Sequence, residues 1–167
     1  MKLTTKKMTM IAVLTALATI LKIVINSLNL PYKFVFHNIP IMIISIFFNP
    51  LYGVLSALIC DLVSIVSTPN WNPLFTIPQL FWGLIPGLFF LRKKELKIYK
   101  LIITEYVSYF TVSFSNFLVF WITISPSYAI GRLPNTLIIL LIKAPIDIII
   151  LHFLNKNLFS KKENLFE

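Results

Sequence analysis

The 167-residue chain is 57% hydrophobic and only 13% charged, with a formal net charge of +9 and a mean hydropathy of +0.86. A soluble domain carries about 25% charged residues, so this composition disfavours a soluble all-α protein with a large core and predicts an integral membrane protein. The apolar runs are continuous and do not alternate with polar residues. We therefore expect an all-α membrane protein and not a closed barrel.

We expect one transmembrane domain over residues 1–167, a bundle of six helices. The first apolar run follows a basic start and contains Ala16-Leu17-Ala18, which would also suit a cleaved signal peptide. The run continues to Ile25, however, and from Met8 it can cover about 27 Å as a helix, so a retained span is favoured. Phe48-Asn49-Pro50 predicts a tight hairpin after a short second span. The expected spans are residues 8–27, 36–48, 50–67, 75–91, 101–124 and 133–154.

Basic residues cluster at three places that an even number of spans puts on one side of the membrane. Cytoplasmic loops are enriched in Lys and Arg, so both termini are expected in the cytoplasm. The clusters indicate topology and not a nucleic-acid surface. Lys33 and Arg132 fall in the outer loops. The cytoplasmic clusters are Lys2, Lys6 and Lys7; Arg92, Lys93, Lys94, Lys97 and Lys100; and Lys156, Lys161 and Lys162.

Charged residues inside the expected spans are functional candidates, because an unpaired charge is costly in hydrocarbon. Lys143 and Asp147 are four residues apart, so they share a helix face and can form an intrahelical ion pair. Asp61 has no local partner, and the alternative to a functional role is a bond to a polar group of another helix. Glu105 is expected to snorkel to the cytoplasmic interface or to pair with a nearby Lys, and Lys22 to snorkel to the outer one.

The stretch of residues 67–75, Ser-Thr-Pro-Asn-Trp-Asn-Pro-Leu-Phe, interrupts the apolar sequence on the outer side with amides, prolines and aromatic rings. One interpretation is the aromatic belt that membrane proteins place at the interface. The other is a cage that stacks on a flat ring and hydrogen-bonds to its edge, and we favour a wall or lid of such a pocket. The candidate groups are Tyr32, Phe34, Phe36, Trp71, Phe75, Trp82, Trp121 and Tyr128, with Asn70, Asn72 and Gln79.

Motifs for catalysis are scarce in this sequence. There is no P-loop motif for nucleotide hydrolysis. The lone Cys60 and the widely separated His37 and His152 give neither a disulfide framework nor a metal-ligand pattern. We therefore expect no enzyme activity, no metal and no cofactor on this chain.

Small residues one helical turn apart occur twice, as Ala12 with Ala16 and as Gly83 with Gly87. Such pairs let another helix approach closely. The approaching helix can belong to a partner protein or to the bundle itself, and the patterns alone leave both interpretations open.

Together, the six spans, the small-residue face and the polar, aromatic outer loops resemble one family over nearly the whole chain. This family is the S component, the substrate-capturing subunit, of energy-coupling factor (ECF) vitamin transporters, and the chain is most similar to its folate-specific members. Departures occur at Asn49, where Gly is usual, at Cys60, where Ala is usual, and at Trp71 and Leu74. The matching residues are Phe36, Ile39, Pro40, Ile41, Pro50, Gly53 and Asp61; Pro73, Phe75, Thr76, Gly83 and Gly87; and Arg132, Lys143, Pro145 and Ile146.

The resemblance implies a multi-pass protein of a prokaryotic plasma membrane that captures folate from outside with high affinity. It also implies delivery through a shared module of an EcfT-type transmembrane subunit and two cytoplasmic ATPases, which would use the ATP. Ala12 and Ala16 would then contact the EcfT-type subunit. The alternatives are an S component for pantothenate, a hydroxymethylpyrimidine, thiamine or riboflavin, a non-transport membrane scaffold or channel-like subunit, and a membrane enzyme.

Folate suits the polar and aromatic residues of the outer half. A carboxylate or amide such as Asp61, Asn72 or Gln79 could pair with the edge of the pterin while aromatic rings stack on it. A cation such as Lys33, Arg132 or Lys22 could neutralise the glutamate tail. The predicted substrate-binding residues are Lys33, Phe34, His37, Asp61, Asn70, Trp71, Asn72, Phe75, Gln79, Trp82, Arg132 and Lys143.

Overall fold

The computed structural model describes residues 4–28, 36–67, 72–91, 97–154 and 156, and this part of the chain contains helices and no strands. Six helices in the described ranges have ten residues or more, and each overlaps one of the expected spans. The elements are α1 (Thr5–Ser27), α2 (Asn38–Phe47), α3 (Pro50–Val63), η1 (Ser64–Ser67), η2 (Pro73–Phe75), α4 (Thr76–Phe90), α5 (Ile98–Thr123), α6 (Pro126–Gly131) and α7 (Leu133–Leu154).

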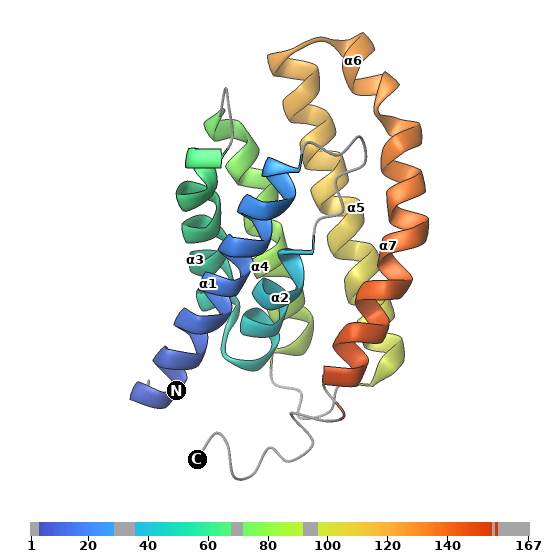
Figure 1. Cartoon of the computed structure of the whole chain (residues 1–167). Coiled ribbons are helices and arrows are strands. Elements are labelled where there is room, and N and C mark those ends of the chain that lie inside the picture. The colour runs from blue at the N-terminus through green and yellow to red at the C-terminus, as the bar shows by residue number, and fades with distance from the viewer. Residues whose placement is uncertain (1–3, 29–35, 68–71, 92–96, 155, 157–167) are drawn as a thin grey trace.

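The helices form a bundle whose two sides are joined by α4 (Figure 1). On one side, α2 and α3 pack against α4 and α1 packs against α2 and α3, while α5 and α7 pack together on the other side. The short α6 connects the tops of α5 and α7. The start of α1 and the end of α7 lie at the same end of the bundle, opposite α6.

Helix α6 is a difference from the sequence-based expectation, which treated residues 125–132 as an outer loop. Ser125 caps this helix, since its hydroxyl oxygen accepts a hydrogen bond from the backbone N–H of Tyr128 at 3.2 Å. Pro126 occupies the first helical turn, where its missing N–H costs nothing. A cap followed by proline is a helix-start signal, and it places Arg132 at the junction of α6 and α7.

The link between α2 and α3 is as tight as the sequence predicts. Asn49 is the N-cap of α3, and its side-chain oxygen accepts a hydrogen bond from the backbone N–H of Leu51 at 2.9 Å. Pro50 follows at the first position of the helix. The capping amide gives a physical role to Asn49 where the resembled family usually has Gly.

Within the described residues, four segments are long and apolar enough to cross a membrane: α1, α3 with η1, η2 with α4, and α6 with α7. Helix α5 has 26 residues, enough for a bilayer core of about 30 Å, but its Ser, Thr, Asn and Glu residues make it less apolar. Helix α2 is apolar but has only 10 residues. Its buried position between other helices removes the need to span the bilayer alone.

The surface of the bundle is apolar and its interior holds charges, which is the reverse of a soluble protein. Phe110, Ile122 and Leu141 are 72%, 75% and 70% exposed. Apolar surface on this scale is unfavourable in water and favourable against lipid. The chain is therefore a membrane-embedded protein. The buried charged side chains are Lys22, Asp61, Glu105, Lys143 and Asp147.

Glycines allow α2, α3 and α4 to cross in direct backbone contact. A Cβ on Gly83 would overlap the carbonyl group of Gly53, and the Ser45 hydroxyl donates a hydrogen bond to the Gly83 carbonyl oxygen. A Cβ on Gly87 would lie 2.6 Å from the Cβ of Pro50. The Gly83 and Gly87 pair is thus used for packing inside the bundle.

This crossing makes Gly83 intolerant of a side chain. We expect Gly83→Ala to lower the free energy of unfolding by about 1–3 kcal/mol, because the added methyl group meets backbone that cannot rotate away. Thermal unfolding of the purified protein in detergent measures the effect. Gly131→Ala is the matched control, since a Cβ there meets nothing within 4 Å. Equal melting temperatures for the two variants would contradict the close crossing.

Candidate functional site

A cavity of about 520 Å³ lies between α4, α5 and α7, with α6 above it. Its volume is in the range of pockets that bind small organic molecules. The lining is mostly aromatic and aliphatic, with a few amides and hydroxyls. The lining residues are Gln79, Trp82, Tyr109, Phe110, Val112, Ser113, Phe114, Asn116, Phe117, Phe120, Ala129, Arg132, Leu133, Asn135, Thr136, Leu137, Ile139 and Leu140.

Trp82 and Tyr109 form the inner wall of the cavity. Their ring centroids lie 5.3 Å apart at an interplanar angle of 84°, an edge-to-face contact that aromatic rings favour. Both residues are at least 94% buried, and Trp82 is only 2% exposed. The inner wall is therefore rigid and aromatic, which suits a flat ring.

Side-chain amides supply hydrogen-bonding groups to the cavity. The Asn135 Oδ1 atom is buried and has no hydrogen-bond partner in the part of the chain that the structure describes. Gln79 uses its Oε1 atom for a contact of 3.2 Å with Nε2 of His37. A buried acceptor without a donor is costly, so Asn135 is suited to receive a donor from a ligand.

Arg132 is the charged residue of the lining. Its guanidinium carbon lies 4.8 Å from the ring centroid of Phe120 and 5.7 Å from that of Tyr128, and it donates a hydrogen bond of 3.3 Å to the Tyr128 hydroxyl. Among the described residues none forms an ion pair with Arg132. Since none of the described lining residues is a carboxylate, this lining has a net positive charge and favours an anionic group.

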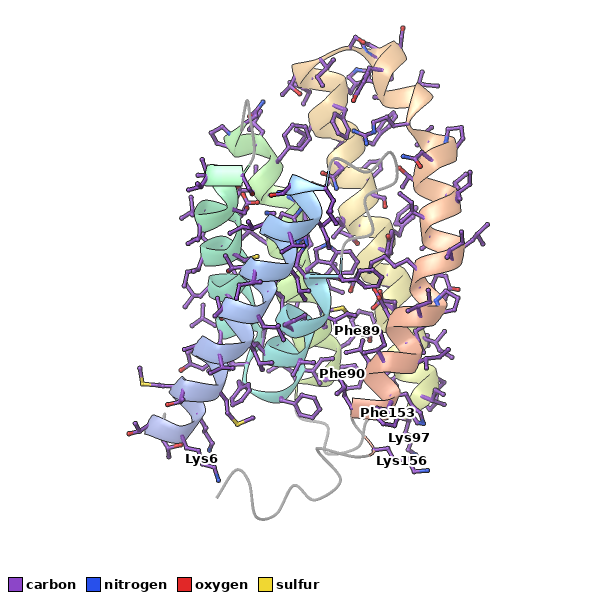
Figure 2. The ribbon with its side chains drawn as sticks, viewed as in Figure 1. Lys6, Phe89, Phe90, Lys97, Phe153 and Lys156 are labelled. Carbon is purple, nitrogen blue, oxygen red and sulfur yellow. The ribbon has the colours of Figure 1, made fainter. Side chains whose placement is uncertain are left out.

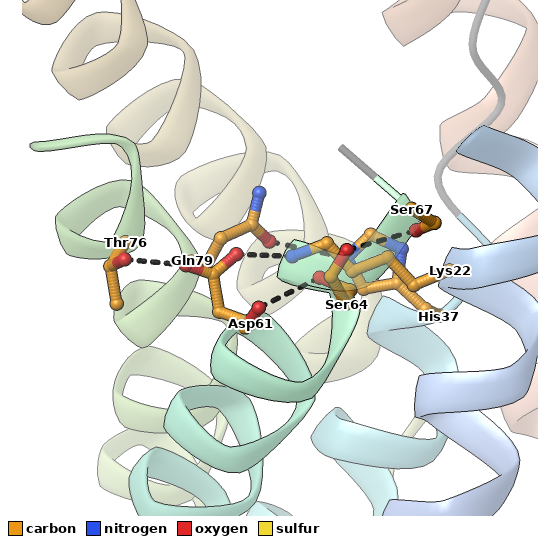
Figure 3. Close-up of polar contacts among 7 residues, drawn as sticks. All are labelled: Lys22, His37, Asp61, Ser64, Ser67, Thr76 and Gln79. Atoms are coloured by element: carbon orange, nitrogen blue, oxygen red, sulfur yellow. Dashed lines mark hydrogen bonds and ion pairs between the residues drawn. The ribbon is translucent and has the colours of Figure 1, made fainter. Parts of the chain in front are cut away.

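A second polar cluster joins α1, α3 and α4 (Figure 3). Lys22 forms an ion pair with Asp61 Oδ1, and the Thr76 hydroxyl donates to Asp61 Oδ2 at 2.5 Å. Lys22 and Asp61 are 8% and 5% exposed. Lys22 was expected to snorkel to the outer interface. It does not, because a carboxylate within the bundle neutralises it.

A third cluster joins α7 to α2. Lys143 and Asp147 form the intrahelical ion pair that their spacing predicts, and both side chains are completely buried. The Asn38 amide completes it: Nδ2 donates to Asp147 Oδ2 at 3.0 Å, and Oδ1 accepts from Lys143 Nζ at 3.1 Å.

Glu105 also differs from expectation. It was expected to snorkel or to pair with a nearby Lys, but its side chain is completely buried. Because α5 starts at Ile98, seven residues earlier, Glu105 lies two turns inside the helix and faces the bundle. Its strongest charged neighbours are Asp147 and Lys143 of α7.

The structure brings some predicted site residues together and separates others. Gln79, Trp82 and Arg132 line the cavity. Phe75 borders it through Phe120, with ring centroids 4.8 Å apart, and His37 borders it through Gln79.

Three further candidates have local partners outside the lining. Asp61 and Lys143 are held in the ion pairs described above. Asn72 caps η2, since its Oδ1 accepts from the backbone N–H of Leu74 at 3.0 Å. Lys33, Phe34, Asn70 and Trp71 lie outside the described residues, and their substrate-binding roles stay predictions.

The lining residues of α5 are the main ones that the sequence interpretation missed. Tyr109, Ser113, Asn116 and Phe120 follow the i, i+4, i+7, i+11 spacing of a single helix face. A face that mixes aromatic rings with hydroxyls and amides does not suit lipid. This periodicity is the sequence signal that could have identified the α5 face as part of the cavity.

These features describe a membrane-embedded protein with a largely aromatic cavity between its helices. The family model for "ECF transporter, substrate-specific component" matches residues 6–159, so the chain belongs to this family. Its members are substrate-binding subunits of transporters and not enzymes, and membership implies an ECF transporter module as partner. A comparison with curated proteins gave no match.

The Lys22–Asp61 pair allows a direct test of how buried charge is compensated. We expect Asp61→Ala to lower the free energy of unfolding by about 3–5 kcal/mol, because it leaves the Lys22 ammonium buried without a counter-charge. The double variant Lys22→Leu with Asp61→Leu removes both charges and should recover most of this loss. Thermal unfolding in detergent compares them. The pairing would be refuted if Asp61→Ala had the melting temperature of the wild type. It would also be refuted if the double variant had a lower melting temperature than Asp61→Ala.

Proposed function

We propose that this S component captures folate from outside with high affinity. The observation that carries the proposal is the charge and shape of the cavity: its described lining residues form an aromatic inner wall with a few amides, and they include one cation and no carboxylate. Folate combines a flat pterin ring with an anionic glutamate tail, and these two parts match the two ends of the cavity.

The pterin would lie against Trp82 and Tyr109, where stacking favours a flat ring. The amides of Gln79, Asn116 and Asn135 would bond to the donors and acceptors along its edge. The tail would extend toward Arg132, where a guanidinium group can hold a carboxylate through two parallel hydrogen bonds.

The charge of the site separates folate from the other vitamins considered. Thiamine is a cation and would be repelled by Arg132. Pantothenate has a carboxylate but no flat ring for the aromatic wall. Riboflavin and hydroxymethylpyrimidine have flat rings but no carboxylate. A scaffold subunit would have no use for an internal cavity of this size.

Delivery would use an EcfT-type transmembrane subunit and two ATPases. Ala12 and Ala16 are exposed on α1, where small residues leave room for a partner helix. Basic side chains support cytoplasmic termini: Figure 2 shows Lys6, Lys97 and Lys156 at the end of the bundle where α1 begins and α7 ends. The cavity lies toward the opposite end, beside α6, and would open to the outside of a prokaryotic plasma membrane.

Isothermal titration of the purified chain with folate, pantothenate, thiamine and riboflavin tests this proposal. We expect saturable folate binding without ATP or partner subunits. Arg132→Gln should weaken it roughly 10–100-fold, because one charge-assisted contact contributes about 1.5–3 kcal/mol.

Lys100→Gln is the control for Arg132→Gln, since it removes a positive charge from a residue that does not line the cavity. This variant should bind folate as the wild type does. Equal affinities of wild type and Arg132→Gln would exclude Arg132 as the tail-binding residue. Tighter binding of thiamine than of folate would overturn the proposed substrate.

A further inference from the structure

The cluster beneath the inner wall of the cavity contains two carboxyl groups, Glu105 and Asp147, and one lysine, Lys143. Lys143 is the cation that faces Glu105, and it is already paired with Asp147. All three side chains have 0% exposure. With both carboxylates ionised, the cluster would hold an uncompensated negative charge at a fully buried position, which is strongly unfavourable.

The cluster also lacks hydrogen-bond donors for its carboxyl oxygens. Both side-chain oxygens of Glu105 lack a partner among the described residues, and so does Asp147 Oδ1. The other oxygen of Asp147 already accepts from Lys143 and Asn38. An ionised carboxylate can only accept hydrogen bonds, so three buried acceptors remain without a donor.

We propose that Glu105 retains its proton and that its O–H group donates a hydrogen bond to Asp147 Oδ1, so that α5 and α7 are joined by a carboxylic acid–carboxylate hydrogen bond. One proton removes the excess charge and supplies the missing donor at once. Two carboxyl groups that share a proton are established chemistry for closely spaced acids. With Lys143 and Asn38, this bond ties α2, α5 and α7 together.

The shared proton also positions the inner wall of the cavity. Lys143 Nζ lies 5.7 Å from the ring centroid of Trp82 and 5.5 Å from that of Tyr109. Loss of the proton would place a second negative charge beside the ammonium group and draw it away from these rings. Glu105 is thus a positioning residue for the site, and this consequence rests on the proposed function.

Few other groups could change the charge around Glu105. Helix α7 contributes Lys143 and Asp147, with His152 further along. Helix α5 itself contributes Tyr99, Lys100, Tyr106 and Tyr109. Helix α4 and η2 contain no titratable residue, and α6 contains only Tyr128, at the opposite end of α5. The alkaline response of the cluster should therefore come from Glu105.

Infrared spectroscopy of the purified protein tests the proton directly. We expect a carbonyl band of a protonated carboxylic acid at neutral pH in the wild type, and its loss in Glu105→Gln. The sequence has only six acidic residues, so a difference spectrum assigns the band. No band at neutral pH, or a band that persists in Glu105→Gln, would overturn the shared proton whether or not folate binds.

Folate titration at rising pH tests the positioning role. Deprotonation of Glu105 at alkaline pH would remove its hydrogen bond to Asp147, so wild-type folate affinity should fall at least several-fold as the pH rises well above neutral. Glu105→Gln keeps a donor for Asp147 and should bind with wild-type affinity at neutral pH but show a smaller alkaline loss. Since the two proteins meet the same ligand, any titration of folate cancels in the comparison. Identical alkaline losses would contradict the positioning role.

Two controls distinguish a proton on Glu105 from simple packing of its side chain and from a bound cation. Glu105→Ala removes the donor and should melt below Glu105→Gln, whereas equal melting temperatures would contradict the hydrogen bond. The hydroxyl oxygens of Thr104 and Ser108 are also buried without a partner among the described residues. They could help Glu105 to bind Na⁺ in place of the proton. Equal stability in Na⁺ and K⁺ buffers is expected, and stabilisation specific to Na⁺ would overturn the proposal.

Discussion

The structure depends on one constraint: a bundle with an apolar exterior must neutralise its buried charges by pairing them with one another. Lys22 with Asp61 ties α1 to α3, and Lys143 with Asp147 and Asn38 ties α7 to α2. A buried pair of this kind adds little stability compared with apolar side chains, but breaking it is costly. The pairs therefore specify which helices meet, while the glycine contacts determine how closely α3 and α4 cross.

The internal pairing also determines what is left for a ligand. Two ion pairs, Lys22 with Asp61 and Lys143 with Asp147, neutralise these four side chains. The charge that lines the cavity is therefore that of Arg132. Membership in the S component family assigns this chain a substrate and a transporter module as partner. In the proposed function, the substrate is recognised at the aromatic wall between the two sides of the bundle, where Lys143 of the α7 cluster lies 5.7 Å and 5.5 Å from the rings of Trp82 and Tyr109.

Much of the fold follows from the sequence, because continuous apolar runs leave a membrane chain few choices other than helices. The Lys143–Asp147 pair was equally predictable from the sequence, since residues at i and i+4 share one face of a helix. The Lys22–Asp61 pair was not, because the two residues are 39 positions apart and meet only through packing. The α5 side of the cavity was missed because Tyr109 and Phe120 look like ordinary lipid-facing residues until their register with Ser113 and Asn116 is considered.

The location of the substrate beside the inner wall is the central claim, and Trp82 reports on it. The chain has three tryptophans, so a variant with Trp71→Phe and Trp121→Phe leaves Trp82 as the single emitter. Its fluorescence is measured during a folate titration, with correction for the absorbance of folate. We expect saturable quenching that follows the binding isotherm measured by calorimetry. Calorimetric binding of folate with unchanged Trp82 emission would contradict this account.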